Sequence, residues 1–365
     1  MAVDAAPAVR PAITGTERFT REVVRRLPMA APDVEWRFYA PFEADLGVPL
    51  SILPAGRLWT QVRLRRELAR SRPDLFVALG HVVPDFITVP AYKVFHDLAF
   101  ERFPEAYPLT ARMYLRHTER SAARRCVRMA AVSEATRQDL VSFYGVPAGR
   151  IDVVHEGGGE GRLAPPPVNG SRLAELGLKK PFALHVGRIE PRKNQASAAA
   201  AAARAGIDLA CVGAVHDRAL AAELRRAPGC HLLGALSDAD RDLLYASALA
   251  LVFPSLHEGF GLPVIEAMSH GLPVVIPRTS SLPEIAGDAA LYVRSALDVE
   301  GMAGWLKRLR EDPALGRRCS EEGRLRAAAF TWDRCAAGLV ESIRTALDSL
   351  SAGEPNTSAG RPAPR

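Results

Sequence analysis

The sequence contains no apolar run that approaches the roughly 20 residues needed to cross a bilayer. Its first residues, 1–4, form neither the basic nor the apolar part of a secretory signal. These absences predict a cytoplasmic protein. Cysteines are also few, five in 365 residues, and none forms a Cys-x-x-Cys pair. We therefore expect neither a zinc site nor a disulfide framework.

Charge of one sign is not strongly in excess. The formal net charge is +6 and the sequence pI is about 9.2, with arginine supplying most of the positive charge. Such a balance suits an anionic small molecule, an acidic membrane surface or nucleic acid, and it does not choose among them. The sequence also has no aspartate cluster of the kind that holds Mg²⁺, so no metal cofactor is expected.

The chain is long enough for two domains of roughly 150 residues each. In both halves, short aliphatic runs such as 92–97 and 181–187 alternate with helical stretches such as 109–126 and 195–205. This alternation predicts an α/β protein made of two doubly wound parallel sheets. A break rich in glycine and proline, from Gly157 to Pro167, is the candidate linker.

We therefore expect an N-terminal domain over 1–165 and a second domain over 170–332. A terminal helix over 333–350 should cross back to the first domain, and the tail 351–365, which lacks hydrophobic periodicity, should be disordered. In a doubly wound fold, ligands bind beyond the carboxyl ends of the strands.

The segment from Glu258 to Glu266 is the strongest candidate site. It follows the expected strand 250–253, and Pro263 suits the first turn of a helix, in which Glu266 would also lie. Gly259 and Gly261 carry no side chains, so backbone N–H groups could approach an anion at the helix N-terminus. The two carboxylates could accept hydrogen bonds from ribose or hexose hydroxyls.

A second candidate segment runs from His185 to Asn194. A strand leads into Gly187, and three cations follow within six residues, ahead of a helix. Arg188 and Lys193 suit a diphosphate, because guanidinium offers a fork and ammonium a mobile point charge. The segment matches neither the P-loop pattern nor the dinucleotide-binding glycine pattern.

These segments together resemble the retaining glycosyltransferases of family 4, which have the two-domain GT-B fold. The resemblance is carried by Gly-Arg-x-x-Pro-Arg-Lys-Asn at 187–194, by two glutamates separated by seven residues at 258 and 266, and by 271–275 and 281–290. It is strongest over 182–293. The GT-B fold implies two Rossmann-like domains that face a cleft, with the nucleotide sugar bound by the C-terminal one.

The resemblance also implies roles for individual residues. Arg188 and Lys193 would hold the donor diphosphate, Glu258 the hydroxyls of the transferred sugar, and Glu266 the ribose. In the first half, His96 resembles the histidine that faces the sugar, and the turn Thr14-Gly15-Thr16 resembles a glycine loop near phosphate. The remaining donor-binding residues implied are Gly187, Gly259, Phe260, Gly261 and Leu262. The family is generally metal-independent, so no cofactor is implied.

Five arginines recur every four residues along the expected helix 109–126 and just beyond it: Arg112, Arg116, Arg120, Arg124 and Arg128. They form a basic ridge. One interpretation is contact with the inner face of a membrane, where lipid-linked acceptors would be reached. The other is a solvated face with Glu119 as a partial partner. Nucleic acid is not indicated, because no recognition fold or interleaved aromatics accompany the charge.

The sequence therefore favours a retaining hexosyltransferase. It would move a sugar from a GDP-mannose-type or UDP- or dTDP-sugar donor to a hydroxyl acceptor, which could be a saccharide, lipid-linked or a small molecule. The alternative is a non-catalytic or regulatory GT-B protein that binds a nucleotide sugar. A GT-B epimerase or phosphorylase is disfavoured by the glutamate pair and by the lack of a pyridoxal-binding lysine motif.

Overall fold

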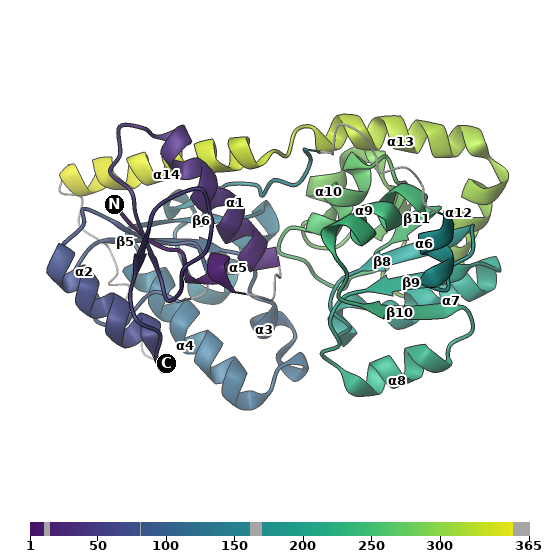
Figure 1. The fold of residues 1–365 in the computed structure, drawn as a ribbon, viewed down its shortest axis with the longest axis horizontal. Helices are drawn as coiled ribbons and strands as arrows, with labels where there is room; N and C mark the ends of the chain where they lie inside the picture. The colour runs from purple at the N-terminus through teal and green to yellow at the C-terminus, as the bar shows by residue number, and fades with distance from the viewer. Residues whose placement is uncertain (11–14, 81, 161–169, 353–365) are drawn as a thin grey trace. The chain divides into compact units, whose positions relative to one another are not determined.

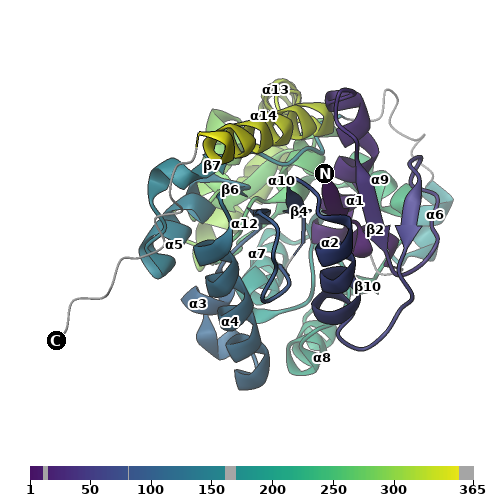
Figure 2. The same cartoon turned by 90° about the vertical axis from the view of Figure 1, so that its left-hand side faces the viewer.

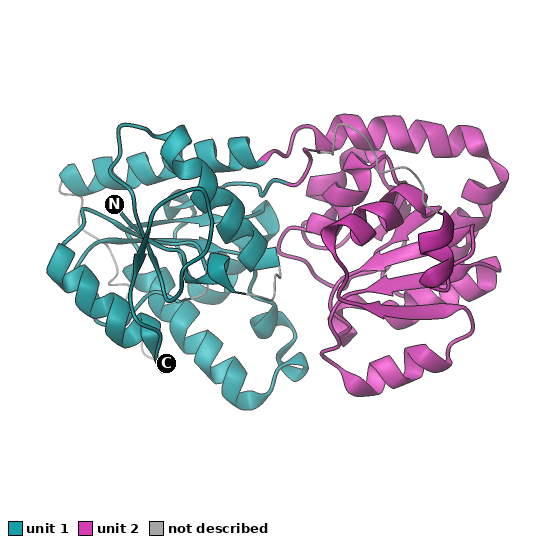
Figure 3. Ribbon diagram, viewed as in Figure 1, with its two compact units in different colours: residues 1–157, 332–365 teal, residues 158–331 magenta. Residues whose placement is uncertain are grey.

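The computed structural model describes residues 1–10, 15–80, 82–160 and 170–352 (Figure 1). Thr14, the prolines of the expected linker and most of the C-terminal tail lie outside this part. The chain divides into two compact units (Figure 3). Unit 1 comprises 1–157 and the chain from Trp332 onward, and unit 2 comprises 158–331. The division after Gly157 comes earlier than the boundary at 165 expected from composition.

Unit 1 contains a seven-stranded parallel sheet in the order β3-β2-β1-β4-β5-β6-β7 within the described residues. Its strands are β1 (Ala2–Asp4), β2 (Arg37–Ala40), β3 (Leu50–Ile52), β4 (Phe76–Ala78), β5 (Ala91–Phe95), β6 (Arg128–Ala131) and β7 (Ile151–Val153). Its helices are α1 (Gly15–Ala30), α2 (Arg65–Ser71), α3 (Ala99–Arg102), α4 (Leu109–Arg125), α5 (Glu134–Tyr144) and α14 (Trp332–Ser351).

Helices cover both faces of the unit 1 sheet, as Figure 2 shows. Helix α1 packs along α14 on one face. On the other face, side chains of α2, α4 and α5 join those of the strands in one apolar core, to which Leu68, Ala122 and Leu140 belong. Because both faces are covered, most strand residues are apolar, as is usual in parallel sheets.

Unit 2 repeats this topology with six parallel strands in the order β10-β9-β8-β11-β12-β13. These are β8 (Phe182–Val186), β9 (Asp208–Val212), β10 (Cys230–Gly234), β11 (Ala250–Val252), β12 (Val274–Pro277) and β13 (Leu291–Val293). The helices are α6 (Gly170–Glu175), α7 (Gln195–Ala205), α8 (Arg218–Arg226), α9 (Asp238–Ser247), α10 (Leu262–Ser269), α11 (Leu282–Ala286), α12 (Val299–Glu311) and α13 (Pro313–Ala327). The prediction of doubly wound α/β halves is confirmed.

Side-chain caps explain where several helices begin. Ser133 accepts a hydrogen bond from the backbone N–H of Thr136, and Asp217 does the same for Leu220. Each cap satisfies a backbone donor that would otherwise lack a partner in the first turn. Helix α7 ends at Gly206, whose φ of +68° is the left-handed conformation that glycine adopts without steric cost.

The glycines of the expected linker have a packing role. A Cβ on Gly157 would come within 2.4 Å of the Trp332 backbone nitrogen, and one on Gly159 within 1.8 Å of the Ala327 carbonyl oxygen. The backbone N–H of Gly159 donates to Phe330 at 2.8 Å. Two chain segments therefore pass so closely here that only glycine fits.

Helix α1 begins earlier than the sequence indicated. Gly15 and Thr16 were expected in a turn, but both belong to α1. The hydroxyl of Thr20 donates to the carbonyl of Thr16 at 2.9 Å, so this first turn is continuous with the rest of the helix.

Candidate active site

The two candidate segments of unit 2 meet at one edge of its sheet. The segment 185–194 continues from β8 and the segment 258–266 follows β11, and these adjacent strands are where the strand order reverses. A crevice outside the carboxyl ends of two such strands is the usual ligand site of this topology. The segments are joined directly, because the Leu256 backbone N–H donates to the Arg192 carbonyl at 2.9 Å.

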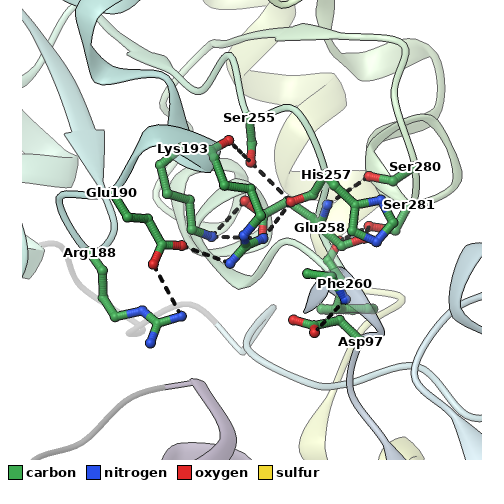
Figure 4. Close-up of polar contacts among 12 residues, drawn as sticks. Asp97, Arg188, Glu190, Lys193, Ser255, His257, Glu258, Phe260, Ser280 and Ser281 are labelled. Atoms are coloured by element: carbon green, nitrogen blue, oxygen red, sulfur yellow. Dashed lines mark hydrogen bonds and ion pairs between the residues drawn. The ribbon is translucent and has the colours of Figure 1, made fainter. Parts of the chain in front are cut away.

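A buried ion pair is the centre of this site (Figure 4). The ammonium group of Lys193 lies 2.6 and 2.7 Å from the two carboxylate oxygens of Glu258. Burial lowers the pKa of Lys193, although the charge of Glu258 opposes this. Burial alone would raise the pKa of Glu258, but Lys193 and Arg192 outweigh it and lower that pKa. Both groups are therefore charged, and they neutralise each other.

Arg192 is a member of the site that the sequence analysis did not select. Its guanidinium donates to the His257 carbonyl at 2.5 Å and to Glu190 at 2.9 Å, and it lies 3.7 Å from Glu258. The side chain is only 5% exposed. The sequence signal for Arg192 was its position between Arg188 and Lys193. Its buried partner His257 lies 65 positions away in the chain, so the contact could not be inferred from the sequence.

Arg188 lies at the accessible side of the site. Its side chain is 40% exposed, and its guanidinium is 3.4 Å from Glu190. That distance is long for a charge-assisted hydrogen bond. Arg188 is thus the cation of this segment that can turn toward an incoming anion with the smallest loss of existing contacts.

Close backbone packing shapes the loop after β8. The carbonyl oxygen of Gly187 lies 2.1 Å from where a Cβ on Gly213 would be placed. Gly213 has a φ of +147°, and Asn194 adopts a φ of +54° where α7 begins. The amide of Asn194 donates to the carbonyls of Pro254 and Ala296. Gly213 and Asn194 therefore fix the path of the loop. Asn194 ends the predicted segment 185–194, whereas Gly213 lies outside both predicted segments.

Two serines hold the loop that carries Glu258. The Glu258 backbone N–H donates to the Ser280 hydroxyl at 2.8 Å. The Ser281 hydroxyl is 3.1 Å from the Glu258 carbonyl and 2.7 Å from that of Phe260. Ser281 is fully buried. The segment 281–290 had been noted for its resemblance, but nothing in the sequence showed that these hydroxyls support Glu258.

Helix α10 begins after Gly261, which has a φ of +110°, and Pro263 lies in its first turn as predicted. Glu266 does not lie in that turn, which contains no acidic residue. The helix starts at Leu262, so Glu266 belongs to the second turn. Its carboxylate accepts a 2.7 Å hydrogen bond from the buried hydroxyl of Tyr245 on α9.

His96 of unit 1 is held by two partners within that unit. Its Nδ1 lies 3.1 Å from a Glu156 carboxylate oxygen and its Nε2 lies 2.9 Å from the Leu79 carbonyl. Burial alone would lower the pKa of His96, but the hydrogen bond and charge of Glu156 outweigh it and raise that pKa. An imidazolium can donate to both partners at once. With both ring nitrogens held by protein partners, His96 is poorly placed to transfer a proton to a ligand.

His185 is a second buried histidine, in unit 2. Its Nδ1 is 2.9 Å from the Val252 carbonyl, and its ring stacks on Phe253. Burial lowers the pKa of His185 to about 4, and nearby Lys193 contributes to the shift. Nε2 has no hydrogen-bond partner among the described residues. The ring is therefore neutral at pH 7.

The expected basic ridge is shorter than predicted. Arg128 lies on β6, beyond the end of α4, and its guanidinium forms an ion pair with Asp152. Glu119 is not a partner of the ridge either, because its buried carboxylate pairs with Lys93 at 3.0 Å. The arginines that remain on α4 are Arg112, Arg116, Arg120 and Arg124. Of these, Arg116 is 3.1 Å from Glu101.

Within the described residues, no group of three or more histidine, cysteine, aspartate or glutamate side chains could hold a metal ion. The same part of the chain contains no helix that is both long and apolar enough to cross a membrane.

Comparison with known proteins assigns the family. Residues 13–157 match the family described as Glycosyltransferase Family 4, and residues 173–326 match Glycosyl transferases group 1. The chain belongs to glycosyltransferase family 4. The family predicted from the sequence motifs is thus confirmed.

Among its relatives is the O-antigen chain mannosyltransferase B of Escherichia coli, 28% identical to this family 4 glycosyltransferase over 70% of each chain. A second relative is the MMP alpha-(1->4)-mannosyltransferase of Mycolicibacterium hassiacum. It is 39% identical, but the match covers only 36% of this chain and 33% of that protein.

Solved structures confirm the GT-B fold of this family 4 glycosyltransferase. HepE of Anabaena, solved with UDP and glucose, has a TM-score of 0.73 at 17% identity and covers 94% of this chain and 99% of its own. WaaG, a glycosyltransferase involved in lipopolysaccharide biosynthesis, has a TM-score of 0.68 at 18% identity, covering 94% of this chain and 98% of its own.

Proposed function

We propose that this glycosyltransferase moves a hexose from a nucleotide diphosphate sugar to a hydroxyl acceptor, with retention of anomeric configuration. The observation that carries the proposal is the buried Lys193–Glu258 pair at the carboxyl edge of the unit 2 sheet, with Arg192 beside it. Opposite charges concentrated at the usual ligand-binding edge suit a substrate that has both phosphates and hydroxyls.

The ion pair suggests how the donor is received. Lys193 would exchange Glu258 for a donor phosphate, which leaves Glu258 to accept hydrogen bonds from sugar hydroxyls. Arg188 would turn from Glu190 to the same diphosphate. Charge on the departing phosphate oxygen is then stabilised by cations already in place, in a buried setting where such interactions are strong.

Retention follows if the acceptor attacks the face from which the nucleotide departs. The bond from the anomeric carbon to the phosphate oxygen breaks, and a bond to the acceptor oxygen forms on the same face. The departing phosphate takes the hydroxyl proton, so the enzyme need supply neither a nucleophile nor a metal. We assign His96 no proton transfer, since both of its ring nitrogens already have partners.

The rest of the donor would lie along the Glu258 loop and α10. We assign Glu266 to the ribose hydroxyls and the backbone amides of Phe260, Gly261 and Leu262 to sugar and phosphate. Mannose is the first sugar to test, because the two relatives named above are mannosyltransferases, and UDP-glucose the second, because HepE was solved with UDP and glucose. Two relatives are named for different acceptors, an O-antigen chain and D-inositol 3-phosphate, so both kinds of acceptor are tested.

The test measures how fast the protein releases nucleotide from candidate donors when no acceptor is present. GDP-mannose, UDP-glucose and dTDP-glucose are incubated with wild type, Glu258→Ala and the surface control Glu300→Ala. We expect one donor to be cleaved by wild type and the control, and about 100-fold more slowly by Glu258→Ala, as for loss of one electrostatic group. Proton NMR of the first product formed with an acceptor then reports its anomeric configuration.

If the wild-type protein cleaves none of these donors, the result favours the alternative, a non-catalytic protein that binds a nucleotide sugar. Thermal shifts with GDP, UDP, dTDP and ADP separate that alternative from a protein that binds no nucleotide, because selective binding stabilises the fold.

For the basic ridge on α4, we propose that the protein is cytoplasmic and that α4 contacts the inner face of the membrane. It is supported by the exposed arginines Arg116, Arg120 and Arg124 together with Leu109 and Met113, which are more than 60% exposed on the same helix. Apolar and basic side chains on one helix suit a membrane surface.

A further inference from the structure

Unit 1 contains a pocket that none of the proposed functions uses. It has a volume of about 210 Å³ and lies beside the edge strand β3. Six residues line it: Leu53, Pro54, Arg63, Arg66, Glu67 and Arg70. Leu53 and Pro54 directly follow β3, and the other four come from α2 and the turn before it. Figure 2 shows α2 on the side of unit 1 that faces the viewer.

The local structure explains why three arginines gather here. A π-helical turn, Thr60–Leu64, leads into α2, and insertions of this kind are frequent at functional sites. Leu64 and Leu68 are fully buried in the core. The arginines at 63, 66 and 70 repeat at helical spacing on another face, so they point away from the core. The Trp59 indole donates to the Leu53 carbonyl at 2.9 Å, which fixes the opposite wall.

The pocket has an excess of positive charge. Its one carboxylate, Glu67, accepts two hydrogen bonds from Arg70 at 2.8 and 2.9 Å. Neither Arg63 nor Arg66 has an ion-pair partner among the described residues. Three guanidinium groups therefore face one carboxylate, which leaves an excess of two positive charges. Gathering like charges costs free energy, and a bound anion would reverse that cost.

We propose that this pocket binds the dianionic phosphate of a small soluble phosphomonoester. Guanidinium forks match phosphate oxygens in geometry, and two uncompensated charges match a dianion. The volume holds about seven waters at roughly 30 Å³ each, enough for a phosphate and part of the carbon skeleton that carries it. Leu53 and Pro54 supply an apolar wall for that skeleton. None of the six lining residues is assigned to the donor, so this proposal goes beyond the proposed function.

The experiment measures binding of inorganic phosphate and of a hexose 6-phosphate by calorimetry at constant ionic strength. It compares wild type with Arg63→Gln/Arg66→Gln and with the control Arg65→Gln, which changes charge on the same helix outside the pocket. We expect the double variant to weaken phosphate binding at least about tenfold and the control to leave it unchanged. Backbone amide NMR shifts around Leu53 and Arg66 should accompany binding only where the pocket is intact.

The proposal is overturned if wild type binds neither ligand, if the double variant binds as wild type does, or if the control loses as much affinity. Binding only to vesicles containing phosphatidic acid, with no soluble phosphate bound, would also overturn it and assign the pocket to a lipid headgroup. Donor cleavage by the double variant is measured alongside. Because no pocket residue belongs to the donor site, failure of this proposal leaves that activity unchanged.

Discussion

Each unit of the molecule contains a buried lysine–glutamate pair, and the two pairs differ in their surroundings. In unit 1, Lys93 on β5 lies 3.0 Å from Glu119 on α4 and donates to the Gly80 carbonyl. In unit 2, Lys193 holds both oxygens of Glu258. Each ammonium also lies near an aromatic ring, of Phe95 and Phe253 respectively. The first pair joins a helix to the sheet, whereas the second lies in loops at the sheet's carboxyl edge.

We interpret the unit 1 pair as structural and propose that the unit 2 pair belongs to the donor site. A buried pair costs desolvation, and removal of one partner leaves an uncompensated charge in either unit. The unit 2 pair is flanked by two arginines, Arg188 and Arg192, on the segment that follows a strand at the switch point of its sheet, whereas the further basic group near the unit 1 pair is His96. Burial of an ion pair therefore does not by itself indicate a ligand site. An excess of positive charge beside the pair, at the carboxyl edge of the sheet, is what favours a ligand site in unit 2.

The largest effects should come from neutralising the two glutamates. We expect Glu258→Gln and Glu119→Gln each to lower stability by about 3–5 kcal/mol, measured by thermal denaturation. At a temperature where both variants are folded, glycosyl transfer should fall about 100-fold in Glu258→Gln and change little in Glu119→Gln. The surface variant Glu300→Gln should stay within about 0.5 kcal/mol of wild type. Equal activity losses in both buried variants would remove the distinction between the pairs.

The buried histidine of unit 2 should produce a pH dependence. The folded pKa of His185, about 4, lies below the unfolded value of 6.5. As pH falls from 6.5 toward 4, the unfolded chain takes up the proton first, so stability is lost over that window, by an amount on the order of 3 kcal/mol. His185→Phe should show a smaller loss in melting temperature over the same range. An unchanged slope in this variant would contradict the assignment.

The histidine of unit 1 should respond in the opposite direction. The pKa of His96 is raised, so its contribution to stability is complete below 6.5 and is lost as pH rises through the folded pKa. Glu156→Gln removes the main cause of the shift. We expect the titration midpoint of the His96 ring, followed by NMR, to fall in this variant, and stability at pH 6 to decrease by about 1.5–3 kcal/mol. A midpoint that does not move would show that Glu156 is not the cause.

The smallest effect concerns the support of Glu266. Tyr245→Phe removes a buried hydrogen bond to this carboxylate and should cost about 1 kcal/mol of stability. If Glu266 binds ribose, the KM for the donor should rise severalfold while kcat stays nearly constant, because this interaction is made equally in the ground and transition states. A change confined to kcat would place Glu266 closer to the reacting atoms than proposed.

The sequence predicted the fold well where its signals were contiguous. Helix α7 has the predicted bounds, Gln195–Ala205, and the strand before it differs by one residue at each end. The predictions were wrong where a sequence pattern extended beyond the helix or turn to which it was assigned. Arg128 continued the four-residue spacing of the arginines into β6, and Gly15 resembled a turn although α1 already begins there.

The candidate site was predictable in its two segments but not in its contacts. Lys193 and Glu258 were selected separately, and their pairing across 65 positions depends on the adjacency of β8 and β11. Ser281, Tyr245 and Gly213 were missed because their partners lie on other elements, and side chains of these types are common anywhere in a chain. Their roles depend on tertiary packing, which hydrophobic periodicity does not report.

The most direct test of the account is calorimetric titration of GDP and UDP into wild type, Lys193→Ala and the control Lys179→Ala. Lys193 is buried beside Glu258, whereas Lys179 is an exposed lysine of the same unit. We predict that one nucleotide binds wild type and the control with equal affinity and Lys193→Ala at least about tenfold more weakly, as expected for a lost charge-assisted contact. Undiminished nucleotide affinity in a folded Lys193→Ala variant would contradict the donor site placed in unit 2.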